Sequence, residues 1–182
     1  MPVYSADAVA RATRIRLVLA DCDGVLTDGG VYVSEHGEAM KRFSLRDGMG
    51  VERLRTLSGI PTGIVTREQS AIVAKRAEKL RIEELHLGVQ DKLPAVREIA
   101  ARRGLTLDEI AYIGDDVNDL EVLDVVGFSA APFDAEPLVL DRVHLRCSRS
   151  GGRGAFREFA EFILAAQHSP AGLRPPFPRD NR

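Results

Sequence analysis

The strongest structural signal in this 182-residue chain is the stretch LVLADCDGVLTD at residues 17–28. A short apolar run that begins near Ile15 ends in two carboxylates and a glycine, which is the pattern of a buried strand followed by a turn. Alternation along a strand places Asp21 and Asp23 on the same face. Ligands of parallel sheets bind just beyond the carboxyl ends of strands. Because two carboxylates so close repel each other unless a cation or a shared proton offsets their charge, the stretch indicates a cation site.

Two other interpretations of this stretch are open. An ordinary acidic turn explains it equally well when it is considered alone. A calcium-binding loop also begins with Asp-x-Asp-Gly, but it requires further oxygen ligands at fixed positions and a final glutamate, whereas Val25, Leu26 and Thr27 follow here. The choice between a turn and a catalytic site therefore depends on the rest of the chain.

The composition is that of an ordinary globular protein, with 45% hydrophobic and 29% charged residues. The formal net charge of −2 and the lack of a polybasic run give no reason to expect binding to nucleic acid or to a membrane surface. Cys22 and Cys147 do not make a disulfide framework. Residues 1–13 lack the apolar core of a signal peptide, and no run approaches the ~20 apolar residues of a membrane helix. These features predict a cytoplasmic protein.

Short apolar runs that alternate with helical periodicity predict an α/β fold with a Rossmann-like, doubly wound parallel sheet. Two alternating runs around a glycine-containing turn predict a β-hairpin at about 29–43. The expected core strands lie at 15–20, 62–65, 85–87, 110–113, 127–130 and 143–145, and the expected longer helices at 51–57, 69–80, 91–103 and 155–167.

We expect a single domain over residues 15–167, because no internal repeat or change in composition divides this part of the chain. Residues 1–14 form an N-terminal extension in this interpretation. Residues 168–182 are rich in proline and arginine, which predicts a disordered tail.

Polar side chains follow several of the predicted strands: Asp21 and Asp23, then Thr66, then Lys92 at the start of its helix, and finally Asp115. In a parallel sheet these strand ends converge on one edge. A carboxylate can act as a nucleophile, carboxylates hold a hard cation such as Mg²⁺, and a lysine neutralises transferring oxygens. The set therefore predicts phosphoryl transfer.

Each member of this set has an ordinary alternative role. Lys92 can be a solvated helix residue, Thr66 can cap a helix, and the acidic residues 115–119 can complement a helix dipole. Their occurrence in this order at successive strand ends favours the catalytic interpretation.

These residues resemble the four motifs of the haloacid dehalogenase superfamily of phosphatases: Asp-x-Asp-Gly-Val-x-Thr-Asp at 21–28, Thr66, Lys92, and Gly-Asp-Asp-x-x-Asp at 114–119. The resemblance is greater to the capless branch of 3-deoxy-D-manno-octulosonate 8-phosphate phosphatases, which also has Phe-x-x-x-Asp-Gly-x-Gly (43–50) and Gly-Gly-Arg-Gly-Ala (151–155). It extends over about residues 15–167 and implies a phosphoric monoester hydrolase without a separate cap domain.

The resemblance implies a role for each matching residue. Asp21 is the nucleophile and a Mg²⁺ ligand, and Asp23 is the general acid and base whose backbone carbonyl also binds the metal. Thr66 binds the phosphate, Lys92 screens the transferring group, and Asp115 is the third protein ligand of Mg²⁺, a site that Ca²⁺ is also able to occupy in a crystal. The remaining implied roles are support of the metal's waters and of Lys92 by Asp116 and Asp119, and substrate binding by Phe43, Asp47, Glu68 and Arg153. Arg67 departs from the pattern of the octulosonate phosphatases, which have glycine at this position, and we expect it to narrow the entrance of the site or to contact the substrate.

The resemblance also implies a homotetramer, with the hairpin and the Arg153 loop at subunit interfaces, acting on a small phosphorylated 2-keto-3-deoxy sugar acid. The eight-carbon octulosonate 8-phosphate is one candidate. A nine-carbon 9-phosphate is the other, because Glu68 and the segment Arg76–Leu80 are similar to that branch. A non-catalytic oligomerisation module that accompanies an acylneuraminate cytidylyltransferase, and a phosphotransfer receiver domain, are alternatives from other classes.

Overall fold

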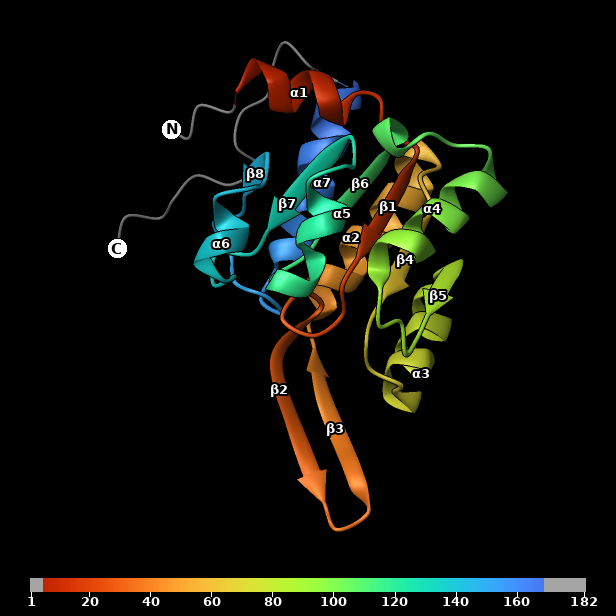
Figure 1. Ribbon diagram of the computed structural model, residues 1–182, viewed down its shortest axis with the longest axis vertical. Coiled ribbons are helices and arrows are strands. Elements are labelled where there is room, and N and C mark those ends of the chain that lie inside the picture. Colours follow the sequence, from red (N-terminus) through yellow and green to blue (C-terminus); the bar gives the residue numbers. More distant parts are fainter. Residues whose placement is uncertain (1–4, 169–182) are drawn as a thin grey trace.

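Within residues 5–168, which the computed structural model describes, six strands form one parallel sheet in the order β5-β4-β1-β6-β7-β8 (Figure 1). Their bounds are β1 Leu17–Ala20, β4 Thr62–Val65, β5 Glu84–His86, β6 Ile110–Ile113, β7 Phe128–Ala131 and β8 Leu145–Arg146. The chain first extends the sheet from β1 to β5 and then returns to place β6 on the other side of β1. This reversal between β1 and β6 is where doubly wound sheets bind ligands.

Helices cover both faces of the sheet, as the predicted fold class requires (Figure 1). One core contains buried side chains of α1 (Ala6–Ala12), α2 (Leu45–Ser58), α3 (Ala71–Leu80) and α7 (Ala155–His168). The other contains those of α4 (Lys92–Arg103), α5 (Leu120–Leu123) and α6 (Pro137–Leu140). Short 3₁₀ helices lie at Leu107–Glu109 and Val117–Asp119. None of the helices in residues 5–168 is long and apolar enough to cross a bilayer.

The central strands are apolar because both of their faces are covered. All four residues of β1 are buried, and alternation sends Val18 and Ala20 into the first core and Leu17 and Leu19 into the second. This arrangement leaves the carboxyl end of β1 as the place where the next polar residues of the chain reach the surface.

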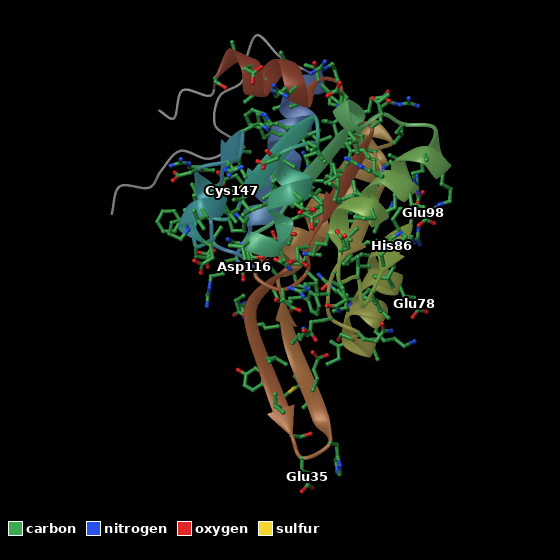
Figure 2. All side chains as sticks on the ribbon, in the orientation of Figure 1. Glu35, Glu78, His86, Glu98, Asp116 and Cys147 are labelled. Carbon is green, nitrogen blue, oxygen red and sulfur yellow. The ribbon has the colours of Figure 1, made fainter. Side chains whose placement is uncertain are left out.

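The predicted hairpin is formed by β2 (Thr27–Ser34) and β3 (Gly37–Phe43), which pair antiparallel and extend away from the body of the molecule (Figure 1). Glu35 lies at its far tip (Figure 2). Most hairpin residues are exposed, and its root adjoins the loop after β1.

Several predicted boundaries are wrong by a few residues. Helix α2 begins at Leu45 rather than after Gly50, because the Ser44 side chain accepts hydrogen bonds from the N–H groups of Arg46 and Asp47 and caps it earlier. Ser70 caps α3 in the same way, so that helix starts at Ala71 and not at Gln69.

The predicted last strand is also displaced, to 145–146, where Leu145 pairs with Ala130 and Arg146 with Ala131. Just before this pairing begins, the Nδ1 atom of His144 accepts a hydrogen bond from the Ser129 N–H group. Strand β5 lies at 84–86 instead of 85–87. The predicted tail, apart from His168 at the end of α7, lies outside the described residues, and the domain boundaries at 15 and 167 stay a prediction.

Candidate functional site

Asp21 lies directly beyond β1, where its N–H donates to the Ile113 carbonyl (3.0 Å) and holds it beside the end of β6. Lys92, the first residue of α4, is buried and places its Nζ 2.8 Å from Asp21 Oδ2 and 2.7 Å from Asp119 Oδ1. Burial and then the charge of Asp119 raise the pKa of Asp21 to about 6, although Lys92 opposes them. Burial lowers the pKa of Lys92, but its two carboxylate partners outweigh that effect, so Lys92 stays charged.

Asp119 is fully buried, and both of its oxygens already accept hydrogen bonds. Oδ1 accepts from Lys92 Nζ and from the Tyr112 hydroxyl (2.7 Å), while Oδ2 accepts from the Asp115 N–H (3.1 Å). A Cβ at Gly114 would lie only 2.4 Å from the Asp119 Cγ atom, so this turn requires glycine. Asp119 is therefore suited to positioning Lys92 and the loop after β6, because it has no free oxygen with which to bind a metal ion.

Asp115 supplies the oxygen that this cluster leaves unpaired. Its Oδ1 atom is buried and has no hydrogen-bond partner within residues 5–168. Burial, followed by the charges of Asp21 and Asp119, raises the pKa of Asp115 to about 8. Oxygens of Asp21, Asp115 and Asp119 lie within 4.8 Å of one another. An orphaned oxygen beside repelling carboxylates fits a hard divalent cation, because the cation would offset both costs.

Asp23 has both carboxylate oxygens engaged. The Thr27 hydroxyl donates to Oδ1 (3.1 Å), and Lys41 Nζ lies 2.5 Å from Oδ2. Sequence reasoning missed Lys41, a hairpin residue whose side chain is buried in the structure. A lysine in a mostly exposed hairpin gives no local signal, because its partner is 18 positions away in the chain.

A cavity of about 280 Å³ opens over these groups. Thr66, buried just after β4, lies in its wall, and its Oγ1 accepts from the Glu68 N–H. Asn118, which sequence reasoning also missed, has a buried Oδ1 without a partner in the described part of the chain. The lining residues are Asp21, Asp23, Gly24, Gly29, Thr66, Arg67, Glu68, Asp115, Asp116 and Asn118.

Of the other predicted site residues, Arg67, Glu68 and Asp116 also line the cavity, whereas Arg153 does not. Asp116 is exposed near the root of the hairpin (Figure 2), where its side chain caps the Val117 N–H. Arg153 is also exposed, with its guanidinium 4.0 Å from Asp28 of the same chain. Arg67 donates to Gln90 at the edge of the cavity.

Phe43 and Asp47 do not line the cavity, whose walls all belong to residues 5–168. Asp47 is buried and accepts hydrogen bonds from the N–H groups of Gly154 and Arg157, which ties α2 to the start of α7. Phe43 carries the Arg76 guanidinium 5.5 Å above its ring. Their role in substrate binding stays a prediction.

The glycine-rich loop before α7 packs directly on the loop after β1. A Cβ at Gly151 would lie 1.8 Å from the Gly24 carbonyl oxygen, and the Gly152 N–H donates to the Val25 carbonyl (2.9 Å). Only glycine permits this approach, so the loop supports the backbone that carries Asp23.

The chain is also similar to known proteins in sequence and in fold. Residues 67–149 match the family model of haloacid dehalogenase-like hydrolases. The chain is 42% identical to the 3-deoxy-D-manno-octulosonate 8-phosphate phosphatase of Yersinia pestis, over 91% of this chain and 88% of the relative.

Two solved structures of similar proteins hold divalent metal ions. One is the phosphatase of the same name from Moraxella catarrhalis, a crystal structure in complex with a magnesium ion, a phosphate ion and a KDO molecule. It matches with a TM-score of 0.85 at 35% identity, and the match covers 88% of this chain and 92% of the Moraxella catarrhalis chain. The cobalt-bound Haemophilus influenzae phosphatase has a TM-score of 0.83 at 38% identity, with 86% and 91% covered.

Proposed function

The chain belongs to the 3-deoxy-D-manno-octulosonate 8-phosphate phosphatase family of haloacid dehalogenase-like hydrolases and is a phosphoric monoester hydrolase, and on this basis we propose that it removes the phosphate of octulosonate 8-phosphate. The observation that carries the proposal is the buried cluster at the ends of β1 and β6, in which Lys92 contacts Asp21 beside an unpaired Asp115 oxygen. An enzyme is favoured over a non-catalytic module because the chain keeps the carboxylates, the hydroxyl group and the lysine that phosphoryl transfer uses.

In the proposed first step, a carboxylate oxygen of Asp21 forms a bond to phosphorus while the bond from phosphorus to the sugar oxygen breaks. Asp23 gives a proton to the departing oxygen. The phosphoryl group then resides on Asp21 as an aspartyl-phosphate. Lys92, held 2.8 Å from Asp21, offsets the negative charge of the oxygens of the transferring phosphoryl group. The Thr66 hydroxyl, in the cavity wall, donates a hydrogen bond to one of these oxygens.

In the proposed second step, a water molecule attacks the phosphorus of the aspartyl-phosphate. Asp23, now ionised, accepts the proton of that water, and the bond between phosphorus and Asp21 breaks to give inorganic phosphate. Asp23 therefore acts as an acid and then as a base, which requires a carboxylate placed beside the cavity, as it is here.

We propose that the divalent cation is Mg²⁺, held by Asp21, Asp115 and the backbone carbonyl of Asp23. The unpaired oxygen of Asp115 and the hard oxygen donors support this choice, as does the magnesium ion in the Moraxella catarrhalis structure. When bound, the cation would neutralise charge on the carboxylates and on the phosphate. Asp119 is proposed to position Lys92, since its own oxygens are occupied.

The test is phosphate release from octulosonate 8-phosphate with and without Mg²⁺. Asp21→Asn should reduce release by at least about a thousandfold, because the amide cannot act as the nucleophile. Asp124→Asn is the matched control, since Asp124 pairs with Arg142 on the surface. Unchanged hydrolysis by Asp21→Asn would show that the nucleophile is misassigned. Faster turnover of a nine-carbon 9-phosphate in the same assay would favour the alternative substrate, with Glu68 in the cavity wall as its contact.

We further propose that the protein is a cytoplasmic homotetramer assembled through its hairpin. Tyr32 and Val33 support assembly through the hairpin, because these apolar residues are 63% and 72% exposed on an element that extends away from the body. The paired substitution Tyr32→Lys with Val33→Lys should give monomers in sizing chromatography, and persistent tetramers would contradict the proposal. In the tetramer, Arg153 would act on a neighbouring site through its exposed guanidinium.

A further inference from the structure

Lys41 has a buried side chain, to which the proposed reaction gives no part. Its side chain is only 3% exposed, and its Nζ lies between two carboxylates, 2.5 Å from Asp23 Oδ2 and 3.1 Å from Glu38 Oε2. Lysine is almost never fully buried unless it is paired, because removing an ammonium group from water is costly. Its place at the root of a largely exposed hairpin therefore indicates a specific requirement for this contact.

The contacts of Lys41 continue as a chain of polar groups from the loop after β1 to the start of α3. The Ser70 hydroxyl donates to Glu38, and Ser70 Oγ also accepts the Val73 N–H as the cap of α3. Asp23, Lys41, Glu38 and Ser70 thus connect the loop after β1, the hairpin and α3. Helix α3 packs into the first core. Ser70 at its start therefore holds Glu38 in place, and Glu38 in turn holds Lys41.

Asp23 is constrained by this chain on one side and by its own loop on the other. Thr27 donates to Oδ1 and Lys41 to Oδ2, so neither oxygen is free to rotate away. Asp23 lines the cavity and Lys41 does not, among the wall residues found in the described part of the chain. Lys41 is therefore placed to act on the substrate only through Asp23.

We propose that Lys41 is a positioning residue for the phosphatase reaction, which holds the Asp23 carboxyl group in the orientation from which it gives a proton to the leaving oxygen. The inference rests on the proposed function, since it takes Asp23 as the general acid. A proton donor must lie within hydrogen-bond distance of the atom it protonates, and a displacement of about 1 Å can cost about a hundredfold in rate. The hairpin is on this account part of the catalytic apparatus.

The test compares two substrates that differ in their need for an acid. The sugar alkoxide of octulosonate 8-phosphate must be protonated as it leaves, whereas nitrophenolate leaves from p-nitrophenyl phosphate without a proton. We expect Lys41→Met to lower kcat/KM for the sugar phosphate about ten- to hundredfold and for p-nitrophenyl phosphate less than about threefold. Because kcat/KM covers only the steps through phosphoryl transfer to Asp21, later hydrolysis does not mask the difference.

Three further variants make the result specific. Lys41→Arg keeps the cation and should restore kcat/KM for the sugar phosphate to within about fivefold of the parent enzyme. Lys75→Met is the matched control, because Lys75 is 83% exposed and should leave both substrates unaffected. Glu38→Gln, which weakens the other anchor of Lys41, should show the same substrate dependence with a smaller loss, and it serves if Lys41→Met does not fold.

The outcomes separate the inference from the function on which it rests. Equal losses on both substrates for Lys41→Met, or no loss on the sugar phosphate, would overturn the role of Lys41 while Asp23→Asn still shows the substrate dependence. If Asp23→Asn itself reduces both substrates equally, the acid role of Asp23 is wrong and the inference about Lys41 fails with it.

Discussion

Binding of Mg²⁺ to this protein should weaken about a hundredfold when the pH is lowered from 8 to 6. The reason lies in Asp115, whose carboxyl group has its pKa raised to about 8 by burial and by the neighbouring charges of Asp21 and Asp119. A metal ion binds the ionised carboxylate, so it must displace a proton that the free protein holds below this pH.

The magnitude can be calculated from the fraction of each carboxyl group that is ionised. With a pKa of about 8, Asp115 is about half ionised at pH 8 and about one per cent ionised at pH 6, which weakens the apparent affinity about fiftyfold. Asp21, with a pKa of about 6, contributes about another twofold over the same interval. At pH 7, binding should release about one proton.

Isothermal titration calorimetry at pH 6, 7 and 8, in two buffers with different ionisation enthalpies, measures both quantities. Asp116→Asn provides an internal check, because an asparagine can still cap Val117 but removes a charge that raises the pKa of Asp115. Its affinity profile should move to lower pH. If the affinity for Mg²⁺ changes by less than about threefold between pH 6 and pH 8, and binding releases no proton, the reasoning is refuted.

The same structure leads to three other predictions. Without metal, the free energy of unfolding should fall as the pH rises from about 4 to about 8, because Asp115 keeps its proton in the folded protein and has lost it in the unfolded chain. Urea titrations in the presence of a chelator measure this, and a free energy of unfolding that rises over the same pH range would contradict the prediction. Gly151→Ala should reduce kcat severalfold, since its Cβ would displace the Gly24 carbonyl, whereas Gly30→Ala, with an ordinary 3.5 Å contact, should retain activity in the same assay. Lys92→Met should destabilise the protein by about 3 kcal/mol in urea unfolding, as it leaves the buried carboxylates of Asp21 and Asp119 without a counter-charge, and Lys75→Met by less than about 0.5 kcal/mol; equal effects of the two would be the contrary result.

Much of the fold could be predicted from local patterns. The short runs predicted as strands at 15–20, 62–65 and 110–113 contain β1, β4 and β6 of the structure, because strands buried on both faces of a parallel sheet are mostly hydrophobic. The convergence of Asp21, Thr66 and Asp115 on one cavity could also be foreseen, since parallel strands all run in one direction and the loops at their carboxyl ends therefore lie at the same edge of the sheet.

Contacts between distant segments carried no such signature. Nothing around Lys41 distinguishes it from a solvated hairpin lysine, and nothing around Asp47 indicates that it accepts hydrogen bonds from the start of α7, more than 100 residues away. Periodicity reports the direction of a side chain relative to its own backbone, whereas its partner depends on how whole elements pack. The buried pairing of Lys92 with Asp21 and Asp119, and the orphaned oxygen of Asp115 beside them, exist only once the sheet has brought β1, β6 and α4 together.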